Sequence, residues 1–150
     1  MPDGNVVREL RQAAGLTQQE LARRAGVAQP NIAAYETGQR APSAAMVARL
    51  RAAAPPRPSR VVADHRAEIL ALAREHKAAH VRVFGSVARG EDVSGSDLDL
   101  LVTFEPGATI YDLAELIDAL EDLTGLRVDV VSEGGLRPGP NPIRDQAIAL

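Results

Sequence analysis

The first third of the chain carries apolar side chains at helical spacing. Val6, Val7, Leu10 and Ala14 share one face of a helix, and Gly15 ends it. Further along, apolar residues recur every three or four positions in three more short segments, and a glycine or a proline separates each segment from the next. This part of the sequence therefore predicts an all-α bundle of short helices.

The second and third of these helices are joined by a very short turn. Thr17 is placed to cap the second helix, and Glu20, three residues later, completes a capping box. Gly26 ends that helix, a third helix is expected over about 29–36, and Ser43 caps a fourth. Two short helices joined so tightly are typical of a helix-turn-helix arrangement.

After this bundle the pattern changes from helical spacing to short apolar runs. An amphipathic helix with an acidic outer face is expected over 112–122, and the glycine- and proline-rich residues 134–142 predict an irregular segment. That segment is expected to lead into a short final helix near 143–149. Strands are expected at residues 81–84, 100–104 and 126–131.

Proline marks the border between the two patterns. Residues 55–60 contain three prolines, which favour extended backbone, so a short and semi-stiff linker is expected between domains at 1–54 and 61–150. Charge divides at the same place, because residues 1–60 carry a net charge of +5 and residues 61–150 carry −8. The basic half is suited to binding a polyanion. The acidic half would bind one only through metal ions.

The amino-acid composition excludes sites that need cysteine and argues against a membrane protein. The chain has no cysteine, which excludes disulfides and thiolate metal sites. It has no long apolar run of the kind that spans a membrane, and it opens with polar residues rather than a basic-then-apolar signal. We therefore expect a cytoplasmic protein with no membrane partner.

The candidate catalytic and binding residues lie at or beside the short apolar runs. Gly85 and Ser86 follow the first run, and Asp97 and Asp99 open the second. Residues two apart on a strand point to one side, roughly 6.5–7 Å apart, so these carboxylates can bracket one or two Mg²⁺ ions. Gly85 lets the backbone approach a phosphate closely, and Ser86 can donate its N–H and hydroxyl. Asp129 lies in a β-branched run, where a lone acid is costly unless it is paired or metal-bound.

The sequence around these residues resembles a known pattern. Residues 84–90 read Phe-Gly-Ser-Val-Ala-Arg-Gly, and residues 96–102 read Ser-Asp-Leu-Asp-Leu-Leu-Val. Both segments, their spacing and the third acid at Asp129 resemble the minimal nucleotidyltransferase branch of the DNA polymerase beta superfamily. The resemblance covers about residues 61–150 and implies a small α/β (α+β) domain with a short mixed sheet.

This resemblance implies a nucleotidyltransferase that moves AMP from ATP, with pyrophosphate leaving and Mg²⁺, two ions expected, as cofactor. Asp97 and Asp99 would bind the metal ions, and Asp129 would hold the catalytic metal and help to activate the attacking hydroxyl. Catalysis would then rest mostly on positioning and electrostatics. Residues expected to bind the nucleotide are Gly85, Ser86 and Arg89, although Arg89 could instead be a solvated arginine of the turn.

A second resemblance covers roughly residues 4–54. Residues 16–27, Leu-Thr-Gln-Gln-Glu-Leu-Ala-Arg-Arg-Ala-Gly-Val, and residues 32–42, Ile-Ala-Ala-Tyr-Glu-Thr-Gly-Gln-Arg-Ala-Pro, resemble the Cro and lambda-repressor (XRE) family. In that family the third helix lies in the major groove of DNA, where Gln pairs with adenine and Ala contacts the thymine methyl. The expected base-reading residues are Gln29, Asn31 and Ala33, and the expected phosphate contacts are Gln18 and Arg40. Gln29 and Asn31 could instead be solvated polar residues at the start of a helix.

Together the two resemblances imply a partner as well as a reaction. Minimal nucleotidyltransferases of this size are typically antitoxins that adenylylate a tyrosine of a HEPN ribonuclease toxin, and a repressor-type domain suits operator binding and autorepression. A homodimer or a hetero-oligomer with the toxin is expected, because operator half-sites normally require two copies. Two alternatives stay open: a transcription regulator whose second domain only binds nucleotide or a partner, and a toxin that nucleotidylates tRNA.

Overall fold

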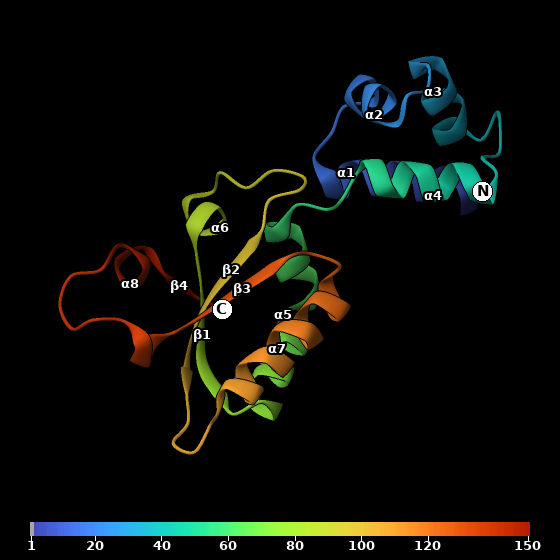
Figure 1. Cartoon of the computed structure of the whole chain (residues 1–150). Coiled ribbons are helices and arrows are strands. Elements are labelled where there is room, and N and C mark those ends of the chain that lie inside the picture. The colour runs from blue at the N-terminus through green and yellow to red at the C-terminus, as the bar shows by residue number, and fades with distance from the viewer. Residues whose placement is uncertain (1) are drawn as a thin grey trace. The chain divides into compact units, whose positions relative to one another are not determined.

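The computed structural model describes residues 2–150, which divide into two units with separate apolar cores (Figure 1). The first unit runs as far as Arg57 and includes Val93–Gly95, and the second holds Pro58–Asp92 and Ser96–Leu150. Within residues 2–150, no helix combines the length and the apolar character needed to cross a membrane.

The first unit is helical, as the sequence predicts. Of the four side chains predicted to share one helix face, Val7 and Ala14 lie in its core, whereas Val6 and Leu10 are only partly buried. Leu21, Ile32 and Leu50 are fully buried in the same core. Burial of each such side chain stabilises the fold by roughly 1.5–3 kcal/mol relative to exposure. Its helices are α1 (Pro2–Ala14), α2 (Gln18–Ala25), α3 (Gln29–Thr37) and α4 (Ala44–Ala53).

The ends of these helices are set by the predicted caps. The Thr17 hydroxyl accepts a hydrogen bond from the Glu20 N–H at 3.1 Å, and the Glu20 carboxylate accepts one from the Thr17 N–H at 2.8 Å. Gly26 then ends α2 in the left-handed conformation, with φ of 68°. Ser43 caps α4 by accepting from the Met46 N–H. The predicted helix-turn-helix geometry of α2 and α3 is thus present.

The second unit is built on a mixed sheet with strand order β3-β2-β1-β4. β1 pairs antiparallel with β2 and with β4, whereas β2 and β3 are parallel and are joined by a helical crossover through α7 (Ile110–Thr124). This mixed sheet and the helical first unit confirm the predicted fold class. The strands are β1 (Ala78–Phe84), β2 (Leu98–Phe104), β3 (Val128–Ser132) and β4 (Ile148–Ala149).

The two faces of this sheet differ in what covers them. Helices α5 (Pro58–Glu75) and α7 pack against one face and bury the apolar core there (Figure 1). The alternation of side chains places Asp99 and Asp129 on the opposite face. The short helices α6 (Gly85–Arg89) and α8 (Pro142–Gln146) pack against each other and against β1, and the 3₁₀ turn Glu133–Gly135 contacts β2.

Two local expectations differ from the structure. Residues 58–60, placed in the linker by the sequence, form the first turn of α5, because a proline at the first position of a helix is readily accommodated. The short final helix expected over 143–149 ends earlier, at Gln146. Ile148 and Ala149 instead pair with β1, whose edge would otherwise leave backbone groups without partners.

Candidate functional site

The carboxylates predicted to bind metal gather where β2 and β3 run side by side. Asp99 and Asp129 are direct register partners on these parallel strands, which places their Cα atoms about 4.8 Å apart. Asp97 lies just before β2, two residues from Asp99, and therefore on the same side of the chain. The β-branched run around Asp129 thus brings it beside an acid that is far away in the sequence.

The electrostatics of Asp99 show how close these acids are. Burial raises the pKa of the Asp99 carboxyl, and the negative charges of Asp129 and Asp97 raise it further, while the positive charge of Arg89 opposes them. Two like charges and one arginine therefore act on a half-buried carboxyl. A bound cation would relieve this repulsion, which is the electrostatic situation expected at a metal site.

Gly85, which opens α6, has to be a glycine, because the Asp99 carboxylate occupies the space that a side chain would need. Gly85 has a φ of 67°, in the left-handed region, and a Cβ added to it would overlap the Oδ2 atom of Asp99. The register explains the contact, because Phe84, the last residue of β1, pairs with Asp99. The sequence predicts that Gly85 makes room for a phosphate, and the structure shows that it makes room for the Asp99 carboxylate.

The residues after Gly85 form one helical turn. The Ser86 carbonyl accepts the N–H groups of Gly90 and Glu91, which closes the turn at its C-terminal end. At its N-terminal end, no side chain caps the helix from the preceding residue, Phe84. Ser86 therefore follows Gly85 in the first turn of α6, where backbone N–H groups have no partner within the helix. Its role in binding a phosphate stays a prediction.

Arg89, expected over the triphosphate, is held by two neighbours in this structure. Its Nε donates to the Glu91 carboxylate at 2.9 Å, and its Nη1 donates to the Gln146 side-chain oxygen at 3.2 Å. Its charge still acts on Asp99. The sequence gave no reason to connect Gln146 with this site, because 57 positions separate it from Arg89.

The donor set fits a hard divalent cation. Within residues 2–150, no group of three or more histidine, aspartate or glutamate side chains is already drawn close enough to hold a metal ion. Mg²⁺ is usually held by one or two protein carboxylates and completed by substrate phosphates and water, so a preformed cage is not needed. Asp97, Asp99 and Asp129 carry oxygen ligands of the kind that Mg²⁺ prefers.

In the first unit, two of the residues predicted to contact DNA, Gln18 and Gln29, are linked by a hydrogen bond. The Gln29 amide nitrogen donates to the Gln18 side-chain oxygen at 2.9 Å, and the Gln18 amide nitrogen donates to Glu36 at 2.6 Å. The Arg40 guanidinium lies 5.9 Å from the centre of the Tyr35 ring, within cation–π range. Gln29 is exposed at the start of α3, and Asn31 and Ala33 follow it on the same helix, partly exposed.

The sequence reasoning missed the residue that organises these side chains. Glu36 is buried, with its side chain 1% exposed, and it accepts two hydrogen bonds from Arg11, at 2.6 and 3.2 Å, besides the one from Gln18. Burial alone would raise the pKa of Glu36, but the hydrogen bonds from Arg11 and Gln18 lower it overall. The sequence places this glutamate directly after Tyr35, and both residues are buried in the structure. Its position beside a core residue was a sequence signal that Glu36 is buried.

Comparisons with known proteins agree with this division of the chain. Residues 7–53 match the model of a helix-turn-helix family, and residues 68–147, more than half of the chain, match that of the nucleotidyltransferase domain. A solved structure provisionally described as a minimal nucleotidyltransferase is 51% identical, with a TM-score of 0.54 over 61% of this chain and 95% of that one.

Curated relatives are similar to the second unit. The protein adenylyltransferase MntA of Thermococcus cleftensis is 46% identical over 59 residues, which are 39% of this chain and 60% of that protein. Two proteins of Methanocaldococcus jannaschii provisionally named as protein adenylyltransferases are 35% and 38% identical, over 47% and 44% of this chain and 76% and 67% of their own lengths. The chain thus spans less than two thirds of the first of these relatives. It belongs to the nucleotidyltransferase family, as a minimal nucleotidyltransferase domain preceded by a helix-turn-helix domain of the XRE type.

Proposed function

We propose that the protein is an antitoxin that transfers AMP from ATP to a tyrosine of a cognate HEPN ribonuclease toxin, and that its first unit binds operator DNA and represses its own operon. The observation that carries the proposal is the site on β2 and β3, where Asp97 and Asp129 act on a half-buried Asp99 beside the Gly85–Ser86 turn. The names of the relatives support a protein as the acceptor.

In the reaction proposed, the tyrosine oxygen attacks the α-phosphorus of ATP, and the bond to the pyrophosphate breaks. Asp97, Asp99 and Asp129 would hold Mg²⁺, which supplies charge stabilisation for the attacking and leaving oxygens when it is bound. Asp129 would lie near the attacking hydroxyl and help to remove its proton. The turn at Gly85 and Ser86 would bind the β- and γ-phosphates, and Arg89 would add positive charge as pyrophosphate leaves.

The exposed start of α3 supports the proposed DNA contacts of the first unit. Gln29 begins α3 exposed, and its side chain is already oriented by Gln18. Asn31 and Ala33 would read bases with it, whereas Gln18 and Arg40 would contact phosphates. A homodimer, or a hetero-oligomer with the toxin, would present two such helices to an operator.

The transfer is tested with Mg²⁺, ATP labelled on the α-phosphate and the HEPN protein encoded nearby. Label is expected on a tyrosine of that protein with wild type, and it should be lost with Asp97→Asn or Asp99→Asn. An Asp64→Asn variant, which alters an exposed ion pair with Arg60, is the matched control. If the wild type binds ATP but labels no protein, the chain is a nucleotide-binding regulator, and if the label appears on tRNA, the toxin alternative holds.

DNA binding is tested on the full chain with the DNA upstream of its own gene. Phosphate contacts release counterions, so the affinity should fall steeply as salt rises from about 50 to 200 mM. Gln29→Ala should reduce the preference for that DNA over an unrelated sequence, because a bidentate base contact is worth about 1–3 kcal/mol. Equal affinity for both sequences in the wild type would contradict operator recognition.

A further inference from the structure

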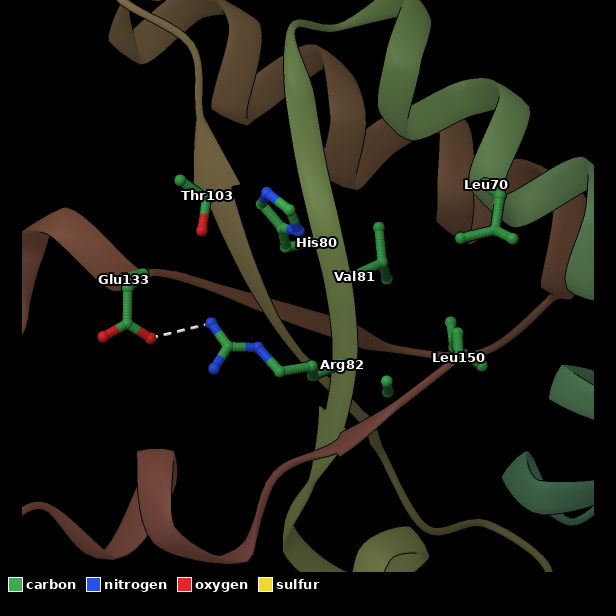
Figure 2. Close-up of a pocket in the computed structure, with 8 residues that line it drawn as sticks. Leu70, His80, Val81, Arg82, Thr103, Glu133 and Leu150 are labelled. Carbon is green, nitrogen blue, oxygen red and sulfur yellow. Dashed lines mark hydrogen bonds and ion pairs between the residues drawn. The ribbon is translucent and has the colours of Figure 1, made fainter.

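The segment after β3 is fastened to the sheet by one carboxylate. Glu133 uses its two oxygens for two different arginines: Arg82 of β1 donates its Nη2 at 2.7 Å, and Arg144 of α8 donates its Nε at 2.5 Å. Figure 2 shows the pair of Arg82 and Glu133, with Arg82 reaching across from β1. The three side chains are only 24–27% exposed, so this ion network is largely removed from water.

Arg144 extends the network into the loop before α8. Its Nη1 donates to the Gly139 carbonyl at 2.5 Å and its Nη2 to the Arg137 carbonyl at 3.4 Å. Asn141 caps α8 by accepting from the Ile143 N–H at 2.9 Å. A glycine- and proline-rich segment, which has little regular structure of its own, is thereby held in one arrangement.

The far end of α8 reaches the candidate nucleotide site. Gln146, its last residue, accepts a hydrogen bond from Arg89 at 3.2 Å, and α8 packs against α6 and β1. A continuous set of contacts therefore runs from β1 through Glu133 and Arg144 to α8, and from Gln146 to Arg89. It ends on the arginine whose charge acts on Asp99.

We propose that Glu133 and Gln146 are positioning residues for Arg89. Glu133 fixes α8 on the sheet, and Gln146 orients the guanidinium beside the site before the nucleotide arrives. An arginine side chain loses rotamer entropy when it is fixed, so orienting it in advance strengthens nucleotide binding. This inference rests on the proposed function, because it assumes that the site on β2 and β3 binds ATP.

A purely structural role for the network is the competing explanation. In that case Glu133 would stabilise the second unit without regard to Arg89. Within the described residues, the Arg82 Nε is buried without a hydrogen-bond partner, so Glu133 satisfies only part of this guanidinium. Arg82 also lines a groove of about 660 Å³ together with Leu70, His80, Val81, Thr103, Glu133, Ala149 and Leu150 (Figure 2). The two roles are told apart by whether the effect of Glu133 depends on Arg89.

The experiment is a double-mutant cycle on the full chain. The dissociation constant of a non-hydrolysable ATP analogue is measured with Mg²⁺ by titration calorimetry for the wild type, Glu133→Gln, Gln146→Ala and Arg89→Ala, and for each of the first two combined with Arg89→Ala. Glu133→Gln and Gln146→Ala are each expected to weaken binding by about threefold to tenfold, the range for a partly exposed hydrogen bond to a charged group. In the Arg89→Ala background neither should weaken it further.

Asp64→Asn serves as the matched carboxylate-to-amide control and should leave binding unchanged, since its ion pair with Arg60 is exposed. A loss that persists at full size in the Arg89→Ala background would overturn the positioning role, as would unchanged binding in Gln146→Ala. Gln146→Ala keeps the test valid if Glu133→Gln fails to fold. Because binding is read directly, a wild type that binds ATP but labels no protein defeats the proposed function alone.

Discussion

Glu36 in the first unit and Asp99 in the second are both withdrawn from water at least in part, and their surroundings shift their pKa values in opposite directions. Glu36 in the first unit accepts hydrogen bonds from Arg11 and Gln18, and its pKa is lowered although burial opposes this. Asp99 in the second unit is half-buried beside Asp129 and Asp97, and its pKa is raised. The protein supplies hydrogen bonds to the first carboxylate, whereas the like charges of Asp129 and Asp97 act on the second and the charge of Arg89 opposes them.

By this contrast Glu36 is a structural acid, whereas Asp99 has the surroundings expected of an acid in a binding site. A buried charge that the protein itself neutralises contributes to the fold, and removing it leaves its partners unpaired. A carboxylate held against like charges destabilises the fold until a ligand arrives, which is the usual condition of a binding site. Variants of the two residues should therefore have opposite effects on stability and on activity.

The largest effect is expected from Asp99→Asn. Transfer of labelled AMP in the proposed reaction should fall about a hundredfold or more, because the variant removes one of the carboxylates proposed to hold Mg²⁺. In the absence of Mg²⁺ the same variant should melt at a higher temperature than the wild type, since the repulsion from Asp129 and Asp97 is removed. Mg²⁺ should raise the melting temperature of the wild type and not that of the variant. A variant that melts lower than the wild type without Mg²⁺ would contradict the contrast.

Glu36→Ala is expected to lower stability and to leave AMP transfer largely unchanged, which is the reverse of the effect expected from Asp99→Asn. The free energy of unfolding of the first unit is expected to fall by about 3 kcal/mol, because Arg11 and Gln18 lose their shared acceptor in a buried position. Hydrogen exchange of the α2 and α3 amides measures this locally, and AMP transfer by the second unit should change little. Glu9→Ala, at an exposed position of α1, is the control and should stay within about 0.5 kcal/mol of the wild type.

Gly85 and Gly90 allow the effect of the close contact with Asp99 to be separated from the effect of backbone strain. Gly85 and its C-cap Gly90 both have positive φ, 67° and 70°, so an alanine at either costs about 1 kcal/mol in backbone strain. Only at Gly85 would the new Cβ overlap the Asp99 carboxylate, since nothing lies within 4 Å of one at Gly90. Gly85→Ala should therefore reduce AMP transfer about tenfold more than Gly90→Ala, at a similar melting temperature. Equal losses would mean that the contact with Asp99 is unimportant.

The smallest effect is a dependence of stability on pH. The pKa of Glu36 is lower in the folded protein than its usual value of 4.5, so its contribution is present above that pH and is lost as the pH falls through the folded value. The difference in unfolding free energy between the wild type and Glu36→Gln should hence be constant near neutral pH and shrink in acid. Urea unfolding at a series of pH values measures it, and a difference that grows in acid would reverse the assignment.

Much of this organisation could be predicted from local sequence. The capping box at Thr17 and Glu20 and the glycine at Gly26 fix α2 through contacts between near neighbours. Asp97 and Asp99 could be placed on one side of a strand because their spacing matches the strand period. These predictions depend on residues within a few positions of one another.

What could not be predicted depends on contacts between distant segments. Glu133 meets Arg82 only because β1 and β3 belong to one sheet, and β1 contains a register shift between Ala79 and Arg82 that the sequence does not show. Lys77 and His80 adopt positive φ, which is uncommon for residues other than glycine. The proline at Pro58 was taken for a linker residue, although it equally suits the start of a helix.

The pairing of Asp99 with Asp129 also has a consequence for how the chain acquires its activities. These residues are separated by the whole of α7, so the site comes into being only when two distant strands join, a slow kind of step in folding. The helices of the first unit form through near neighbours and leave the ribosome first. A newly made chain is therefore expected to reach its DNA-reading shape before it can assemble its carboxylate site.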